Sequence, residues 1–436
     1  MVDEICRRSV LRALGASAAA HATGILGATS LMSNSAHAGA ATASSLVTGA
    51  TALATAGFAP LGGRRVGLVT NQTGRVGDHH IADLLHDARG IELAAIFAPE
   101  HGFRGAIEAG AKVEHGRDAR TGVRVLSLYG ATRKPTPDML RGIDVLVFDI
   151  QDVGVRFYTY ISSMGLAMQA AAAARIPFVV LDRPNPIGGV DVSGFVLEPA
   201  FKSFVGQYPM PIVHGMTVGE IARMIQGERW LDGLDRLDLE VVEMRGWLRG
   251  MRWPETGLPW VPTSPNIPTF TSALVYPGMG LVGETLVNEG RGTPTPFELF
   301  GAPWIDAEDA AAALDGQRLA GVRFEPVRYT PRAIANVAAD PRFRDTTIAG
   351  VRLLVEDVAR YRPLEVGMHV LAHLSRTSRA SGVPLFDKLK MFRLTSGTRR
   401  LYDMLARGAD AEDLIGAWST EVAQFRIARA PYLMYE

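Results

Sequence analysis

Short apolar runs alternate with helix-like stretches through the first half of the chain. Four runs have the length and composition of buried strands, at residues 65–70, 94–98, 143–150 and 177–181. Stretches of helical character lie between them, at residues 80–88, 137–141 and 162–174. Because strands that are linked through helices run parallel, with right-handed crossovers, this alternation predicts an α/β fold with a Rossmann-like parallel sheet.

Each predicted strand is apolar along its length and is followed by polar residues at its carboxyl end. Ligands of open α/β sheets bind beyond that edge, where the ends of parallel strands meet. We therefore expect a polar cleft there, formed by the residues that follow the four strands: Asn71, Glu100, Asp152, Arg156, Asp182, Arg183 and Asn185.

The segment after the second strand holds the densest group of reactive side chains. Glu100, His101 and Arg104 follow Pro99 within five residues, with glycines between and beside them. A carboxylate at a strand end, beside an imidazole and a guanidinium, is typical of a group with a shifted pKa. Glu100 is therefore the first candidate for a catalytic residue.

Two later segments supply further candidates for the walls of the cleft. Residues 259–268 contain four prolines around Ser264 and Asn266, which predicts a rigid loop. Residues 278–293 are rich in glycine, which permits close approach of the backbone to a ligand. A G-x-G-x-x-G match in this segment does not indicate a nucleotide site, because Pro277 precedes it and no first βα unit surrounds it. The charged candidates among these glycines are Glu284, Glu289 and Arg291.

The pattern changes near residue 301, which indicates a second domain. A helical stretch, two strand-like runs and several amphipathic helices follow, the first three at residues 306–314, 322–327 and 350–355. We expect a Rossmann-like catalytic domain at residues 39–300 and a smaller α/β C-terminal domain at residues 301–436. The active-site cleft would lie between them.

The first 38 residues have the features of an export signal. Arg7 and Arg8 form a twin-arginine pattern, a weakly apolar stretch follows, and residues 36–38 form an A-x-A cleavage site. That stretch is rich in Ala, Gly and Ser, so a membrane anchor is the weaker interpretation. We expect cleavage after Ala38 and export to the periplasm in the folded state, which would leave the mature chain without its only cysteine, Cys6.

Composition and missing motifs exclude several classes of function. The 45 basic and 45 acidic residues give a formal net charge of zero, with no positive surplus for nucleic acid or a membrane surface. The chain has neither a G-x-S-x-G nucleophile motif nor a Walker loop. His369 and His373 have a spacing that suits metal ligands on a helix, but histidines with satisfied contacts are commoner there. We expect no metal and no cofactor.

Carboxylates, arginines and tyrosines remain as the available chemistry. Paired carboxylates hydrolyse glycosides, one protonating the leaving oxygen and the other acting as base or nucleophile. Arginines bind carboxylates through two parallel hydrogen bonds, and Tyr158 and Tyr160 offer stacking faces and hydroxyls. The set fits a hydrolase of an acidic sugar, and it also fits an exported protein that only binds such a sugar.

Structural roles are the alternative for several of these residues. A polar residue beyond a strand can simply shape the loop in which it lies. The structural alternatives are an ion pair between Asp152 and Arg156, a turn at Asp182 and Arg183, and a solvated helix face with Glu284 and Glu289.

Six motifs make the chain similar to a known family. They are TNQTG at 70–74, PEHGFRG at 99–105, FDIQDVGVRFYTY at 148–160, DRPNP at 182–186, SPNIP at 264–268 and NEGRGT at 288–293. In this order they span essentially the whole predicted mature chain. The chain resembles exported bacterial exo-β-N-acetylmuramidases, a family long known only as a domain of unknown function.

The resemblance implies a fold, an activity and site residues. It implies two domains with a cleft between them, and removal of terminal N-acetylmuramic acid from the non-reducing end of peptidoglycan fragments during cell-wall turnover. Glu100 would be the catalytic residue, assigned here as general acid, with a second carboxylate among Glu289, Glu284 and Asp152. The alternatives are a non-catalytic muropeptide-binding protein and, more weakly, a metal hydrolase. The substrate-binding candidates are Asn71, His101, Arg156, Tyr158, Tyr160, Asp182, Arg183, Asn185, Asn266 and Arg291.

Overall fold

The computed structural model describes residues 46–105, 107–387 and 389–436. The predicted signal peptide at residues 1–38, with Cys6, therefore lies outside the described residues, and the export route stays a prediction. Within the described ranges, no helix is both long enough and apolar enough to cross a membrane.

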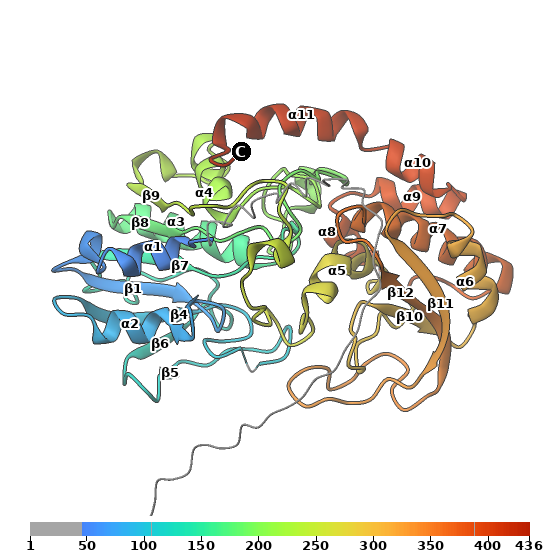
Figure 1. Ribbon diagram of the computed structural model, residues 1–436, viewed down its shortest axis with the longest axis horizontal. Helices are drawn as coiled ribbons and strands as arrows, with labels where there is room; N and C mark the ends of the chain where they lie inside the picture. The colour runs from blue at the N-terminus through green and yellow to red at the C-terminus, as the bar shows by residue number, and fades with distance from the viewer. Residues whose placement is uncertain (1–45, 106, 388) are drawn as a thin grey trace, which may run out of the picture. The chain divides into compact units, whose positions relative to one another are not determined.

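A seven-stranded sheet forms the centre of the first lobe (Figure 1). Its strands are β1 (Arg65–Thr70), β4 (Glu92–Ala98), β5 (Gly116–Arg117), β6 (Arg124–Ser127), β7 (Val145–Asp149), β8 (Phe178–Leu181) and β9 (Leu239–Val242). Their order across the sheet is β5-β6-β4-β1-β7-β8-β9, and only β5 is antiparallel to its neighbour. The predicted parallel sheet is confirmed. A separate hairpin consists of β2 (Arg75–Val76) and β3 (His79–His80).

Helices cover both faces of this sheet and create two cores. The helices are α1 (Gly49–Thr55), α2 (Ile81–Asp87), α3 (Tyr160–Ala174) and α4 (Val218–Gly227). In β7, Val145 and Val147 belong to the core with α1 and α2, whereas Leu146 and Phe148 belong to the core with α3 and α4. Because both faces are covered, β7 and β8 are buried along their whole length and have continuous apolar sequences.

Of the three helices predicted between the strands, two form and one does not. Residues 80–88 and 162–174 correspond to α2 and α3, and His80 is the N-cap of α2. Residues 137–141 form a turn, so the helix predicted there is wrong. Pro135 precedes this segment and Gly142 ends it at φ +78°, which leaves too few residues for the costly first turn of a helix to be followed by others.

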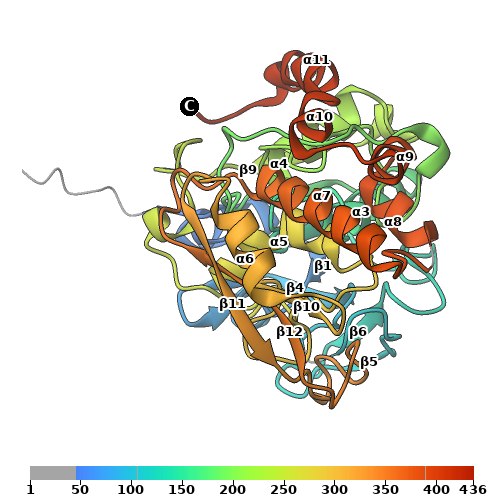
Figure 2. The same ribbon diagram turned by 90° about the vertical axis from the view of Figure 1, so that its right-hand side faces the viewer.

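A three-stranded antiparallel sheet forms the centre of the smaller second lobe. Its strands are β10 (Leu299–Ala302), β11 (Val322–Tyr329) and β12 (Ile348–Val355), in the order β10-β12-β11. The helices of this lobe are α5 (Phe270–Val282), α6 (Ala307–Asp315), α7 (Pro363–Ser381), α8 (Leu389–Ser396), α9 (Arg400–Arg407) and α10 (Ala411–Gly416). Helix α6 packs against β11 and β12 (Figure 2). The predicted smaller α/β domain is confirmed, and its boundary at residue 301 stays a prediction.

The G-x-G-x-x-G match lies inside helix α5 and extends to its C-cap, and its first glycine has a packing role. A Cβ atom on Gly278 would lie 2.6 Å from the Cα atom of Gly367 in α7, closer than side-chain contacts allow. The two glycines therefore let α5 and α7 cross at close range. This segment is part of a helix–helix contact.

The end of the chain returns from the second lobe to the first (Figure 1). Arg429, the last residue of α11 (Ser419–Arg429), donates hydrogen bonds to the carbonyls of Gly189, His214 and Gly215. The hydroxyl of Tyr435 then donates to Asp182, just beyond β8, at 2.6 Å. The remaining short helices are η1 (Ala59–Leu61), η2 (Pro199–Phe201), η3 (Leu234–Arg236), η4 (Trp253–Thr256) and η5 (Ala430–Tyr432).

Candidate functional site

A cavity of about 310 Å³ lies between the two lobes, at the carboxyl edge of the large sheet. Residues from both lobes line it, so the cleft expected at this edge is present. Acidic side chains reach it from each lobe. Eight of the predicted site residues belong to its lining: Glu100, His101, Tyr158, Tyr160, Asn266, Glu284, Glu289 and Arg291.

Glu100 reaches the cavity from the turn that follows β4. Its carboxylate accepts a hydrogen bond from the Thr159 hydroxyl at 2.7 Å and another from the Gly110 amide at 2.9 Å. Thr159 is the N-cap residue of α3, so this carboxylate lies near the positive end of a long helix. His101 follows in the left-handed region at φ +70°, a conformation that few residues with a Cβ adopt. The chain thus turns sharply at the point where it presents Glu100.

Two polar neighbours in this part of the cavity are held uncharged. The His101 Nδ1–H donates to the carbonyl of Ile107 at 2.8 Å, and burial lowers the pKa of the imidazole. Burial, followed by the negative charge of Glu100, raises the pKa of Tyr129 to about 12. His101 and Tyr129 therefore offer hydrogen-bonding groups without a full charge near neutral pH.

The second lobe contributes two acids and an arginine from the segment between α5 and β10. The Glu289 carboxylate lies 2.9 Å from the Arg291 Nε. A Cβ atom on Gly283 would lie 3.1 Å from the Glu289 Cδ, so this glycine leaves room for the carboxylate. Burial raises the pKa of Glu284, and the charge of Arg291 opposes the rise. The segment is a loop, so the alternative of a solvated helix face is wrong.

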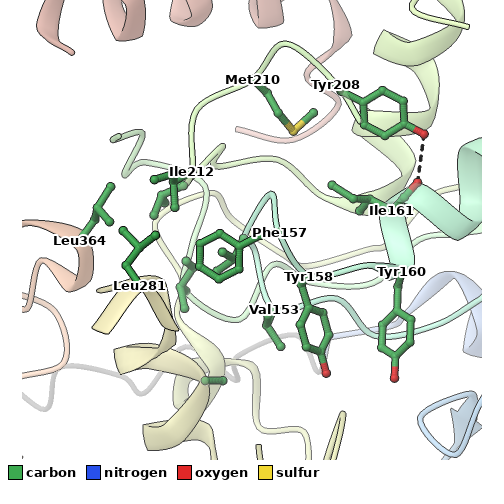
Figure 3. Packing of buried hydrophobic residues seen from close by; sticks show 14 of the residues in the cluster. Val153, Phe157, Tyr158, Tyr160, Ile161, Tyr208, Met210, Ile212, Leu281 and Leu364 are labelled. Carbon is green, nitrogen blue, oxygen red and sulfur yellow. Dashed lines mark hydrogen bonds between the residues drawn. The ribbon is translucent and has the colours of Figure 1, made fainter. Parts of the chain in front are cut away.

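Tyr158 and Tyr160 hold the proline-rich loop against the first lobe. Their rings meet edge to face with centroids 5.0 Å apart, and both hydroxyls point the same way in Figure 3. Both hydroxyls donate to Thr263, one to its hydroxyl oxygen and one to its carbonyl, each at 2.8 Å. Asn266 in the same loop donates to the carbonyl of Val337 in the second lobe at 2.7 Å. The tyrosine hydroxyls are thus occupied by this loop.

The other six predicted site residues lie outside the cavity lining: Asn71, Asp152, Arg156, Asp182, Arg183 and Asn185. Arg183 pairs with Asp149 at 2.6 Å, and both side chains are buried. Asp182 accepts hydrogen bonds from the hydroxyls of Thr217 and Tyr435 and from the Gly219 amide. The side chains of Asn71 and Asn185 likewise bond to nearby groups of the chain. These contacts support loops; the catalytic role of Asp152 and the substrate-binding roles of the other five stay predictions.

Arg156 donates its hydrogen bonds to backbone carbonyls. Its guanidinium is buried and lies 2.7 Å from the carbonyl oxygen of Phe195 and 2.9 Å from those of Met210 and Thr395. Burial lowers the pKa of this guanidinium to about 9. The alternative of an ion pair with Asp152 has no counterpart among the described residues.

Asp152 instead lies beside His214 in a buried, neutral pair. The Asp152 Oδ2 is 3.9 Å from the His214 Nε2 and accepts a hydrogen bond from the Gly154 amide at 2.7 Å. Burial raises the pKa of Asp152 to about 7 and lowers the pKa of His214 to about 3. Between these values both side chains are uncharged, which avoids the cost of burying two ions.

Several residues that line the cavity are missed by the sequence analysis: Tyr129, Thr159, Tyr276, Phe297 and Met391. Thr159 lies between two predicted residues, so the motif at 148–160 holds the signal for it. Tyr129 follows β6, a short strand that begins with Arg124 and has no long apolar run to predict it. Tyr276 and Met391 lie on helices and Phe297 in a loop, and no motif singles them out.

The histidine pair at positions 369 and 373 lies on α7, away from the cavity lining. Burial lowers the pKa of both imidazoles, and the His373 Nε2 lies 3.4 Å from the Thr377 hydroxyl. In the described ranges, no group of three or more His, Cys, Asp or Glu is arranged to hold a metal ion.

Replacing Asp152 by Asn tests whether this buried carboxyl titrates near neutral pH. In the unfolded chain an aspartate has a pKa of about 3.9, whereas burial raises the pKa of native Asp152 to about 7. Between about pH 4 and pH 7 the native state therefore binds a proton that the unfolded state has lost, and this group's contribution to stability falls as pH rises.

We therefore expect the Asp152→Asn variant to gain free energy of unfolding, relative to the unchanged protein, as pH rises from about 5 to about 8. The measurement is urea unfolding of both proteins at the two pH values. His214 titrates in both proteins, so the difference between them isolates Asp152. An equal difference at both pH values would contradict the raised pKa.

Matches to known families cover most of the described chain. The N-terminal part of "exo-beta-N-acetylmuramidase NamZ" matches residues 66–271, and its C-terminal part matches residues 274–435. A Bacillus subtilis (strain 168) protein named peptidoglycan beta-N-acetylmuramidase NamZ is 41% identical over 380 residues, which cover 86% of this chain and 88% of that protein.

Solved structures with the same fold include two DUF1343 family proteins from Bacteroides fragilis NCTC 9343. The first is 38% identical with a TM-score of 0.82, and the second is 33% identical with a TM-score of 0.72. Each similarity covers 90% of this chain and 99% of the other. On these matches, the chain belongs to the exo-β-N-acetylmuramidase NamZ family of glycoside hydrolases.

Proposed function

We propose that this protein is an exo-acting glycoside hydrolase that releases terminal, non-reducing N-acetylmuramic acid from peptidoglycan fragments. Membership of the NamZ family and the name of the Bacillus subtilis relative support a muramidase activity. The observation that carries the proposal is the cavity itself, where carboxyl groups from both lobes meet a single guanidinium.

The carboxyl groups suit glycoside hydrolysis, which in most such enzymes uses two of them. Glu100 approaches from the first lobe, and Glu284 and Glu289 approach from the second. Asp152 lies outside the cavity lining, so the 284–289 segment is the better source of the second carboxyl group. Glu100 and one acid of the second lobe would then act on the glycosidic bond held between them.

Arg291 suits recognition of the lactyl carboxylate that distinguishes N-acetylmuramic acid from N-acetylglucosamine. It is the only arginine or lysine among the described residues that line the cavity. The Nε of Arg291 faces Glu289, and the side chain is 41% exposed. The N–H groups on its two terminal nitrogens therefore remain as donors for a ligand. A guanidinium binds a carboxylate through two parallel hydrogen bonds, which gives both attraction and orientation.

Contacts between loops of the two lobes support an exo mode of action. The Ala339 amide donates to the Glu108 carboxylate at 2.8 Å, and the Asn266 side chain donates to the Val337 carbonyl. Ala109 and Gly110, next to Glu108, line the cavity together with Asn266. These contacts bridge the two lobes beside the cavity, which suits a pocket for one terminal sugar, whereas an endo-acting enzyme needs a groove open at both ends.

Features of the sequence support a periplasmic setting for the proposed activity. The twin arginines and the A-x-A site within residues 1–38 support export to the periplasm. Peptidoglycan-derived muropeptides or disaccharides would meet the protein there, and the activity would serve cell-wall turnover. Electrophoretic size of the protein in a periplasmic extract, compared with the full-length chain, tests cleavage after Ala38.

The first functional test uses a chromogenic N-acetylmuramide, with the matching N-acetylglucosaminide as control substrate. We expect release from the muramide alone, and a fall in kcat of about 10²- to 10⁴-fold in Glu100→Gln. Binding of a muramyl disaccharide should largely survive, because glutamine has nearly the shape of glutamate. Glu308→Gln on the exposed face of α6 is the matched control and should retain full turnover. Tight binding without turnover by the unchanged protein would favour a binding protein.

Replacing Arg291 by Gln tests the recognition of the lactyl group. A charge-assisted hydrogen bond contributes about 1.5–3 kcal/mol, so KM for the muramide should rise about 10- to 100-fold. Arg323→Gln, at an exposed ion pair on β11, provides the matched control and should leave KM unchanged. The muramide KM is measured for both variants under the same conditions. An unchanged KM in Arg291→Gln would refute the assigned role of Arg291.

A further inference from the structure

The three carboxyl groups that line the cavity differ in their hydrogen-bond and ion-pair partners. Glu100 accepts one hydrogen bond on each oxygen, from a backbone amide and a hydroxyl. Glu289 forms an ion pair with Arg291. The carboxyl of Glu284 has neither a hydrogen-bond nor an ion-pair partner within the described ranges, although it lines the same cavity. The three acids are therefore placed for different roles.

The surroundings of Glu284 favour its protonated form. It follows α5 and is half-buried, and burial is the largest cause of its raised pKa. The charged groups that face it are Arg291 and Arg342, which oppose the rise, and Glu289, which adds to it. A carboxyl group in this situation keeps its proton to higher pH than an ordinary glutamate, as a general acid must.

The hydrogen bonds of Glu100 fit the opposite role. Both of its oxygens accept hydrogen bonds from the chain, so the carboxyl group is held in one orientation at the cavity wall. An ionised carboxylate is the form that only accepts hydrogen bonds. A carboxylate held in this way suits the role of base or nucleophile at the anomeric carbon.

We propose that Glu284 is the proton donor of the reaction and that Glu100 is the second carboxylate. The inference rests on the proposed function, and it reverses the general-acid role assigned to Glu100 from the sequence. Glu289, paired with Arg291, would then orient the guanidinium that binds the lactyl group.

The step balances as a hydrolysis. The bond between the anomeric carbon and the glycosidic oxygen breaks, its electron pair stays on the oxygen, and that oxygen takes the proton of Glu284. One water supplies the new oxygen on the anomeric carbon. In a direct displacement the proton of this water goes to Glu100. In a double displacement Glu100 first forms a glycosyl ester, and the water that cleaves the ester returns its proton to Glu284.

The test compares two substrates that differ in their need for a proton donor. A 4-nitrophenyl N-acetylmuramide has a leaving group that departs as a stable anion, whereas a muramyl disaccharide has a sugar alkoxide that must be protonated. The proteins are the unchanged chain, Glu284→Gln, Glu100→Gln and the surface control Glu308→Gln. For each, kcat/KM is measured on both substrates, and urea unfolding checks that the variants fold.

We expect Glu284→Gln to lose about 10²- to 10⁴-fold in kcat/KM on the disaccharide and less than about tenfold on the nitrophenyl glycoside. Glu100→Gln should lose activity on both. Two results would overturn the inference: a loss confined to the disaccharide in Glu100→Gln instead of Glu284→Gln, or equal losses of Glu284→Gln on both substrates. Either result would leave the glycosidase function intact. An unchanged protein that hydrolyses neither substrate would refute the proposed function itself.

The pH dependence of kcat/KM supplies a second readout. In the unchanged protein, activity on the disaccharide should fall at high pH as the proton donor ionises. In Glu284→Gln this basic limb should be absent from the residual activity, because glutamine does not titrate. A basic limb that persists unchanged in this variant would place the proton donor elsewhere.

Discussion

The buried guanidinium of Arg156 joins the two lobes beside the cavity, and the geometry of the site depends on it. It extends from the loop after β7 and donates to two carbonyls of the first lobe and to the Thr395 carbonyl in α8 of the second. Gly397, at φ +77°, packs against the guanidinium, where a Cβ atom would lie 2.5 Å from Nη2. Because α8 also carries Met391 in the cavity lining, this contact helps to set the distance between the walls.

At the carboxyl edge of the sheet, the residues that hold loops in place are different from those that line the cavity. The Asp149–Arg183 pair and the hydrogen bonds of Asp182 are buried behind the edge, where they fix the loops that follow β7 and β8. Glu100 alone among the acids predicted at this edge belongs to the cavity lining. The second lobe then brings Glu284, Glu289 and Arg291 opposite to it. The proposed reaction therefore depends on both lobes and on the contacts that hold them together.

The sequence predicts strands β1, β4, β7 and β8 because each holds an apolar run with polar residues after it, whereas β5 and β6 are short and contain arginine. The same signal assigns too many residues to the site, since polar residues such as Asp182 and Arg183 can equally bond to neighbouring strand ends and loops. Motifs identify Glu100 and Arg291, which line the cavity. Tyr276 and Met391 reach the cavity only through packing of α5 and α8, and no local pattern reports such packing.

In the proposed reaction, one terminal N-acetylmuramic acid binds between Glu100 and the acidic segment of the second lobe, with its lactyl carboxylate on Arg291. The most direct measurement is a crystal structure of Glu100→Gln with a muramyl disaccharide. We expect the terminal sugar inside the cavity, with the glycosidic oxygen within hydrogen-bond reach of Glu284 and the lactyl group against Arg291. A disaccharide bound elsewhere, or bound with its lactyl group turned away from Arg291, would contradict this proposal.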